Sequence, residues 1–266
     1  MTNNKNIYIY SKRDEESLKK KAVVESTLLQ EGFSITPNDK EANLIISLGS
    51  DGAFLQAVQK TGFRQDCFYI GISVKKKHGL YCDFYYNNLP EMILAIQNTE
   101  LDVRSYPLIE VKIDNHRPFY CLNEFSIRST IIKTLVSDIT IDDNYFETFR
   151  GDGLIISTPS GSTAYNKSVD GAVVDPQLRC FQVTELASVN TNEYRTLGSS
   201  FILGEERRLQ LRVHQDGNHF PSMASDNEAL GIRNAEIIGV ELSEKSIKTI
   251  KLNNNSFWEK VQRIFL

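Results

Sequence analysis

The pattern of apolar residues changes near residue 101, and this change limits what the chain can fold into. Before it, continuous apolar runs alternate with helical stretches, which is typical of parallel strands buried on both faces. The runs lie at residues 7–10, 44–48 and 68–72, and the helical stretches at residues 14–30 and 89–97. After it, apolar and polar residues alternate with a period of two, as at residues 109–114 and 209–214. This alternation predicts half-buried antiparallel strands, so a βαβαβ region is followed by a β-rich region.

We therefore expect an α/β plus all-β protein with a Rossmann-like or flavodoxin-like domain at residues 1–100 and a β-sandwich domain at residues 101–252. Ser256 and Glu259 form a capping box that predicts a final helix over residues 256–266. A segment this short cannot fold alone, so we expect it to dock on the α/β domain. Further strand-like pieces lie at residues 119–127, 135–141, 153–157, 181–189, 236–242 and 246–252.

Composition excludes several classes of protein. The 266 residues carry a formal net charge of -4, whereas nucleic-acid backbones and anionic membranes select a basic surface. Eighteen consecutive apolar residues occur nowhere, and the segment Met1 to Asn6 is polar overall rather than a basic region leading into an apolar one. The four cysteines lack CxxC spacing, so we expect buried reduced thiols. These features predict a cytoplasmic protein with no nucleic-acid or membrane partner.

The segment Gly49-Ser50-Asp51-Gly52 is the first candidate site. It follows a buried apolar run and precedes helical spacing, so it predicts a glycine turn whose free backbone N–H groups suit phosphate oxygens. The Asp51 carboxylate could hold a divalent cation that bridges phosphates, or accept a proton from an attacking hydroxyl. Alternatively, Asp51 caps the helix and the glycines only permit the turn.

A second candidate consists of Arg150-Gly151-Asp152-Gly153 and the later segment 158–166, Thr-Pro-Ser-Gly-Ser-Thr-Ala-Tyr-Asn. Small hydroxylated residues around glycine suit ribose hydroxyls, and Tyr165 offers a flat face for an aromatic base. The alternative is an ordinary turn that caps a short helix. A serine nucleophile is disfavoured because GxSxG is absent.

Asn123 and Glu124 form a third candidate, because adjacent strand residues face opposite ways and one of them would enter the core unless a ligand or loop receives it. The run Lys75-Lys76-Lys77 suits a solvated loop or a phosphate chain. The histidines lack paired-ligand spacing, which argues against a zinc site.

Taken in order, the G-x-D-G turn, the Asn-Glu pair, R-G-D-G and S-T-P-S-G-S-T-A-Y-N resemble bacterial NAD kinases over essentially the whole chain. The last segment is highly specific, whereas the G-x-D-G turn alone is shared with diacylglycerol, sphingosine and 6-phosphofructo kinases. The resemblance implies transfer of the terminal phosphoryl of ATP to the 2′-hydroxyl of the adenosine ribose of NAD, giving NADP. It also implies a homotetramer, while phosphoryl transfer from ATP calls for a divalent cation, expected to be Mg²⁺.

By resemblance, Asp51 is the catalytic aspartate, and Asn123 and Glu124 hold the nicotinamide-side ribose. The NAD-binding positions implied in the same way are Gly52, Asn123, Glu124, Arg150, Asp152, Ser160, Thr163, Ala164, Tyr165, Asn166, Lys167, Ser168 and Ala187, and no metal ligand is assigned.

Three departures from the family pattern concern the site. Ser50 and Ala53 replace glycine and threonine of GGDGT, Asp170 replaces a glycine, and lysines occupy residues 75–77. These changes motivate an alternative, a non-catalytic NAD(P)-binding or sensory protein on the same scaffold. Because Asp51 is retained, an active NAD kinase, in the form of a divergent second isoform, is favoured.

Overall fold

The computed structural model describes residues 5–75, 79–98, 101–130, 133–215, 220–252 and 255–266. It divides into two compact units, which we describe separately. Unit 1 consists of Met1–Ser105 and Ile247–Leu266, and unit 2 consists of Tyr106–Ser246. Two long strands, β6 (Val103–Ile113) and β17 (Ile237–Ile250), continue from one unit into the other.

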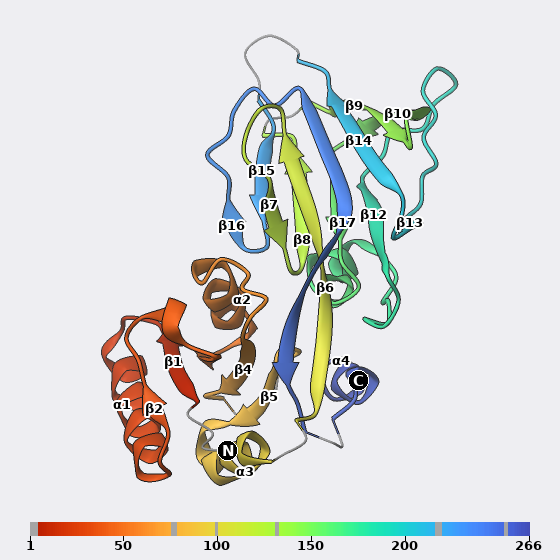
Figure 1. Ribbon diagram of the computed structural model, residues 1–266. Coiled ribbons are helices and arrows are strands. Elements are labelled where there is room, and N and C mark those ends of the chain that lie inside the picture. Colours follow the sequence, from red (N-terminus) through yellow and green to blue (C-terminus); the bar gives the residue numbers. More distant parts are fainter. Residues whose placement is uncertain (1–4, 76–78, 99–100, 131–132, 216–219, 253–254) are drawn as a thin grey trace. The chain divides into compact units, whose positions relative to one another are not determined.

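Unit 1 is built on a parallel sheet (Figure 1), in which β3 lies between β1 and β4, and β2 lies beyond β1. Ile46 of β3 pairs with Ile9 on one side and with Ile70 on the other. The predicted apolar runs are therefore confirmed as neighbouring buried strands. The elements are β1 (Asn6–Ser11), α1 (Glu15–Gln30), β2 (Ser34–Ile35), β3 (Leu44–Gly49), α2 (Asp51–Lys60), β4 (Phe68–Ser73), β5 (Cys82–Tyr85), α3 (Leu89–Gln97) and α4 (Phe257–Phe265), with short 3₁₀ helices at Asp39–Glu41 and Tyr86–Asn88.

Helices cover both faces of this sheet. Ile7 and Ile9 of β1 pack in one cluster with residues of α1 and α3. Tyr8 and Tyr10 point to the other face, where they pack against alanines of α2. Alternate residues of one strand thus serve two layers, as the continuous apolar pattern predicts. Helix α1 begins at its N-cap Asp14, and Gly32, which lies two residues past its end, has a φ of +82°.

Unit 2 is a β-sandwich, as expected. One sheet contains β10, β9, β14 and β17 in that order, with β6 beside β17 and β7 beside β6. The other sheet has the order β13-β12-β11-β8-β15-β16, and a single apolar core contains residues from both sheets. The elements are β7 (Phe119–Cys121), β8 (Glu124–Arg128), β9 (Leu135–Ile141), β10 (Asn144–Gly151), β11 (Gly153–Ser157), β12 (Cys180–Leu186), β13 (Phe201–Gly204), β14 (Arg208–Val213), β15 (Ser222–Ser225) and β16 (Glu228–Ala229), with 3₁₀ helices at Gly161–Thr163 and Tyr165–Val169.

Three of the predicted strand pieces differ from the structure. The piece expected at residues 119–127 is two strands, β7 and β8, which belong to different sheets and are separated by Leu122 and Asn123. The pieces expected at residues 236–242 and 246–252 are instead one 14-residue strand, β17. Strand β17 pairs with β14 over residues 237–241 and with β4 at Thr249, and β6 also lies beside it.

The predicted final helix is confirmed, including its capping box. The Ser256 hydroxyl accepts from the Glu259 N–H at 3.2 Å, and the Glu259 carboxylate accepts from the Ser256 N–H at 2.6 Å. The helix docks in unit 1 through Phe257 and Lys260, which are buried, while Ile264 and Phe265 are exposed by 37% and 40%. Part of the apolar surface of this helix therefore stays outside the face that packs.

All four cysteines are free and buried, which confirms the predicted thiols. Within the described residues, no helix is long and apolar enough to cross a membrane.

Candidate active site

Asp51 is the first residue of α2, directly after the carboxyl end of β3. It does not cap the helix, because the N-cap residue is Ser50 and the Asp51 side chain turns toward another segment. The Leu80 N–H donates to Asp51 Oδ2 at 2.7 Å, and the Tyr81 N–H donates to Oδ1 at 2.9 Å. The capping alternative is therefore wrong, and the acid is held at the sheet edge where open α/β folds bind ligands.

Two glycines permit this arrangement. A Cβ at Gly79 would overlap the Asp51 carboxylate, so the backbone there approaches the acid as closely as it can. A Cβ at Gly49 would lie 2.7 Å from the Cβ of Ala53. The turn and the segment opposite it therefore enclose the carboxylate from two sides.

The environment of Asp51 changes its affinity for a proton. Burial raises the pKa of the carboxyl above its ordinary value, while the N–H groups of Tyr81 and Leu80 and the positive charge of Lys260 oppose that rise. A carboxylate with a raised pKa accepts a proton more readily than an exposed aspartate does. Of the predicted basic run, Lys75 is exposed, and Lys76 and Lys77 lie outside the described residues.

Asn123 and Glu124 are both buried, at 8% and 5% exposure. Their backbone is held by Asp226, whose carboxylate accepts from the N–H of Asn123 at 2.7 Å and from the N–H of Glu124 at 3.3 Å. The Leu122 N–H also donates to Asp226, at 3.2 Å. Asp226, a loop residue with a φ of +52°, thus accepts the backbone N–H groups at the break between β7 and β8.

The Glu124 and Asp226 carboxyls form a buried acidic pair. Burial and the negative charge of Asp226 raise the pKa of Glu124 to about 8, although the Tyr165 N–H opposes this. Burial likewise raises the pKa of Asp226 to about 6, against the backbone N–H groups that it accepts. Glu124 Oε2 is buried without a hydrogen-bond partner in the structure. A buried oxygen of this kind is suited to a hydroxyl supplied by a ligand.

The loop after β11 folds by means of its own hydroxyl groups. Thr158 Oγ1 donates to the Leu122 carbonyl at 2.6 Å, and Ser160 Oγ donates to the same carbonyl at 3.1 Å. Asn166 Nδ2 donates to the Ser162 carbonyl, and its Oδ1 accepts from Thr184 at 2.6 Å. Ser160 and Asn166 are fully buried, so their side chains shape the loop.

The other predicted residues of this loop are more open. Thr163, Ala164 and Tyr165 are half-buried, and Lys167 and Ser168 are exposed. The Ser168 hydroxyl donates to the Tyr165 carbonyl at 2.7 Å.

Two features of this loop bear on ligand binding and on a departure from the family pattern. The guanidinium of Arg128 lies 5.8 Å from the centroid of the Tyr165 ring. Asp170 has a left-handed φ of 63° at the end of the second 3₁₀ helix, so an aspartate occupies a conformation that favours glycine.

Arg150, Asp152 and Ala187 gather at the opposite end of β11. The Asp152 N–H donates to the Leu186 carbonyl at 2.8 Å, and the Val189 N–H donates to the Arg150 carbonyl at 2.7 Å. Asp152 and Ala187 are exposed, and Ala187 has a φ of 45°.

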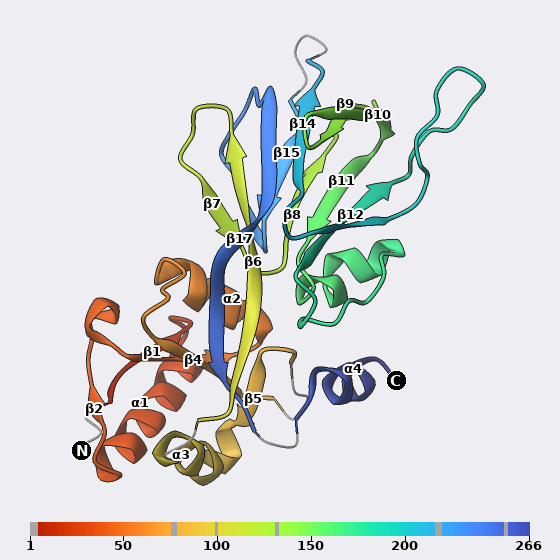
Figure 2. The same ribbon diagram turned by 45° about the vertical axis from the view of Figure 1, so that its right-hand side comes forward.

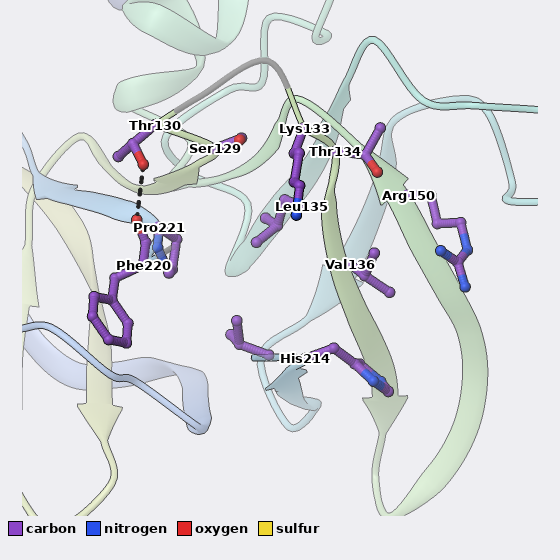
Figure 3. Close-up of a pocket in the computed structure, with 11 residues that line it drawn as sticks. Ser129, Thr130, Lys133, Thr134, Leu135, Val136, Arg150, His214, Phe220 and Pro221 are labelled. Atoms are coloured by element: carbon purple, nitrogen blue, oxygen red, sulfur yellow. Dashed lines mark hydrogen bonds between the residues drawn. The ribbon is translucent and has the colours of Figure 1, made fainter. Parts of the chain in front are cut away.

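Arg150 also lines a pocket of about 300 Å³ (Figure 3). Lys133 and His214 lie in the same pocket, where the Thr130 hydroxyl donates to the Phe220 carbonyl at 3.0 Å. The guanidinium of Arg150 lies 4.1 Å from the centroid of the Tyr194 ring.

Strand register places these predicted residues in two groups. Ser157, at one end of β11, pairs with Glu124, whereas Gly153, next to Asp152, pairs with Arg128. Four residues of strand separate the ends by about 13 Å. Tyr165 connects them, because its N–H bonds to Glu124 and its ring lies near Arg128. The predicted binding residues of unit 2 therefore form an extended row of polar groups and do not gather at one place.

Among the described residues, no group of three or more His, Cys, Asp or Glu side chains could hold a metal ion. Both oxygens of Asp51 already accept backbone N–H groups. The described side chains therefore do not form a ligand set for a resident metal held by protein groups alone.

These features define a class of protein, in which an α/β unit with an acid at its sheet edge is combined with a β-sandwich unit that has a buried carboxyl pair. The family model of the ATP-NAD kinase C-terminal domain matches residues 122–252. NAD kinase 2 of Bacillus subtilis is 56% identical over 98% of both chains, and NAD kinase 2 of Geobacillus kaustophilus is 53% identical over 98% of this chain and 97% of its own. The chain therefore belongs to the NAD kinase family, and its enzyme class is that of ATP-dependent NAD kinases.

Solved structures show the same fold. Yeast NADH kinase complexed with NADH has a TM-score of 0.85 at 15% identity, covering 99% of this chain and 88% of its own. The NAD kinase from Archaeoglobus fulgidus in complex with ATP has a TM-score of 0.77 at 23% identity, covering 98% and 99%. The expected two-part α/β and β-sandwich architecture is thereby confirmed.

Two residues of the site, Asp226 and Lys260, carry no signal in the sequence that identifies them. Asp226 follows a short strand in a turn, where aspartate is common for conformational reasons, so its sequence carries no functional signal. Lys260 lies in a helix whose apolar residues dominate the pattern, and a lysine there is ordinarily expected at the surface.

Proposed function

We propose that Asp51 is the general base of the reaction in which this NAD kinase makes NADP. The observation that carries the proposal is the position of the Asp51 carboxylate, which is held by two backbone N–H groups at the carboxyl edge of the sheet and has a raised pKa. Such a group is oriented for one task and accepts a proton more readily than an exposed aspartate does.

In the proposed step, Asp51 accepts the proton of the 2′-hydroxyl of the adenosine ribose of NAD. The ribose oxygen forms a bond to the γ-phosphorus of ATP, while the bond from that phosphorus to the β,γ-bridging oxygen breaks. ADP leaves with the bond's electron pair, and NADP carries the transferred phosphoryl group. The chain's own contribution is to orient the hydroxyl and remove its proton.

We also propose that unit 2 binds NAD through the row of polar groups that ends at Glu124. The unpartnered Glu124 Oε2 supports this, because a ribose hydroxyl would complete its hydrogen bonding. Tyr165 contributes a half-buried ring for stacking. Ser160 and Asn166 act through the loop that they hold together.

A divalent cation, proposed to be Mg²⁺, enters with ATP. When bound, it neutralises charge on the phosphate oxygens. NADP formation should therefore stop in excess EDTA and resume when Mg²⁺ is added beyond the chelator.

We propose a homotetramer as the assembly. Exposed apolar side chains of unit 2 support a surface that is covered in the assembly, since Tyr145 and Phe146 of β10 and Ile202 of β13 are exposed by 66%, 42% and 50%. The Phe146 ring lies 5.4 Å from the ring of Phe201 in β13, which brings these side chains to one region. Light scattering coupled to size-exclusion chromatography measures the assembly, and a monomer at assay concentrations contradicts it. The free buried cysteines support a reducing, cytoplasmic location.

The test of the base is Asp51→Asn, with NADP coupled to an NADP-specific dehydrogenase. We expect kcat to fall by about 10²–10⁴, with little change in the KM for NAD. Asparagine can accept from only one of the two N–H donors, so the melting temperature is measured beside turnover. Asp66→Asn, at an exposed position of unit 1, is the matched control and should keep normal turnover.

Turnover of Asp51→Asn within about threefold of the wild type would remove Asp51 from the chemistry. The alternative, a non-catalytic NAD(P)-binding protein, predicts instead that the wild type itself makes no NADP in this assay, and the named kinase relatives do not favour it.

A further inference from the structure

Helix α4 carries a lysine that is completely buried. Lys260 has 0% exposure, and its Nζ donates to the Leu80 carbonyl at 2.7 Å and to Asp83 Oδ2 at 2.7 Å. Burying an ammonium group is unfavourable unless it is paired and hydrogen-bonded. The lysine is therefore tied to these two partners, of which Asp83 lies in β5 and Leu80 lies two residues before that strand. Figure 2 shows β5 and α4 in the same part of unit 1.

The same backbone segment holds the proposed base. The carbonyl of Leu80 and the N–H of Tyr81 belong to one peptide group, which accepts from Lys260 on one side and donates to Asp51 Oδ1 on the other. Leu80 adds a second N–H to Asp51 Oδ2. Hydrogen bonds linked through a peptide group polarise one another, so the lysine strengthens the bond to Asp51 as well as fixing its position.

Further contacts hold Tyr81 and Asp83, the residues on either side of Cys82. The Tyr81 ring stacks on Phe54 of α2, with centroids 5.0 Å apart and an interplanar angle of 4°. On the other side, Asp83 Oδ1 accepts from Asn255 at 2.6 Å, and Asp83 Oδ2 accepts from Arg104 at 3.1 Å. The segment is therefore clamped between α2 and the end of the chain.

The charges in this cluster are unequal. Lys260 and Arg104 share one buried carboxylate, Asp83, which is 2% exposed. One positive charge is in surplus, and the Asp51 carboxylate lies near enough for the Lys260 charge to lower its pKa. The cluster therefore favours the ionised, proton-accepting form of Asp51 as well as its orientation.

We propose that Lys260 is a positioning residue for phosphoryl transfer, which holds the Leu80–Tyr81 peptide group against Asp51 and so links the final helix to the reacting centre. This inference rests on the proposed role of Asp51. Its physical basis is that small displacements of a catalytic group reduce turnover strongly while substrate binding persists.

The variant Lys260→Met keeps an apolar stem of similar length and removes the charge and both hydrogen bonds. We expect kcat at saturating NAD and ATP to fall by about 10- to 100-fold, with each KM within about threefold. Ser256→Ala is the matched control, because it weakens the same helix by removing its cap and leaves Lys260 in place. It should lower the melting temperature and keep normal kcat.

The decisive measurement combines Lys260→Met with Asp51→Asn. If the lysine acts through Asp51, the double variant should turn over within about twofold of Asp51→Asn alone, measured at high enzyme concentration. A further loss equal to that of the single lysine variant would overturn the proposal, since the two residues would then act independently. Normal kcat in Lys260→Met with reduced stability would also overturn it.

Normal turnover in Asp51→Asn gives a different failure, because the proposed base itself is then wrong. Where Lys260→Met folds too poorly to assay, Lys260→Gln retains an N–H donor for Leu80. It is expected to lose less activity than Asp51→Asn, and unchanged kcat in this variant counts against the proposal in the same way.

Discussion

Replacing Glu124 by glutamine should remove a large pH dependence from the stability of unit 2. The folded protein holds a proton on Glu124 up to a pKa of about 8, whereas the ordinary value of this carboxyl is 4.5. Between these two values the folded state binds a proton that the unfolded state has lost. The free energy of unfolding therefore falls as the pH rises from about 4.5 to about 8. Above pH 8 the whole of this loss in the free energy of unfolding is present.

The magnitude follows from the displacement of the pKa. A tenfold change in proton affinity corresponds to about 1.4 kcal/mol, so the cost at pH 9 is at most about 5 kcal/mol. Glutamine resembles the protonated acid and cannot ionise. We expect Glu124→Gln to match the wild type near pH 5 and to exceed its free energy of unfolding by about 2–5 kcal/mol at pH 9. The Asp226 carboxyl is present in both proteins, so its own titration largely cancels in the difference.

Urea unfolding followed by circular dichroism at pH 5, 7 and 9 measures this difference. Glu236→Gln, at an exposed position of the same unit, is the matched control and should show no growing gain. A difference between Glu124→Gln and the wild type that stays constant to within about 1 kcal/mol from pH 5 to pH 9 would refute the reasoning.

Three further substitutions test the site. Gly79→Ala should lower kcat at least about tenfold, because its Cβ would displace the Asp51 carboxylate. Gly231→Ala is the control, because a Cβ there meets open space and should leave kcat unchanged. Equal kcat in the two variants contradicts this prediction. Tyr165→Ala should raise the Kd for NAD in calorimetry more than it lowers saturated turnover, and an unchanged Kd argues against stacking. Asn166→Ala should destabilise the protein by about 2–4 kcal/mol in urea unfolding, since it leaves buried partners unpaired, and a loss below about 0.5 kcal/mol contradicts this.

The elements that could be predicted are those whose residues carry their own local signal. Strands β3 and β4 are short apolar runs between turns, and α4 begins with a capping box within four residues. Asp51 could also be predicted, because a glycine turn after a buried strand places an acid at the sheet edge wherever the rest of the chain lies. In each case the physical cause acts over a few residues. It is either the burial of a continuous apolar run or a hydrogen bond between neighbouring residues.

Tertiary structure alone decided the partners that make the site specific. Nothing near Asn123 indicates that the strand breaks there, because the break is held by Asp226, which is 103 residues away. Nothing near Lys260 indicates that it is buried, because its partner Leu80 is 180 residues away. Sequence patterns report which residues avoid water, but the bonding of one buried polar group is satisfied by whichever distant group the fold brings to it. The acid of the site was therefore determined by local sequence, and the groups that orient it and set its pKa by the folded chain.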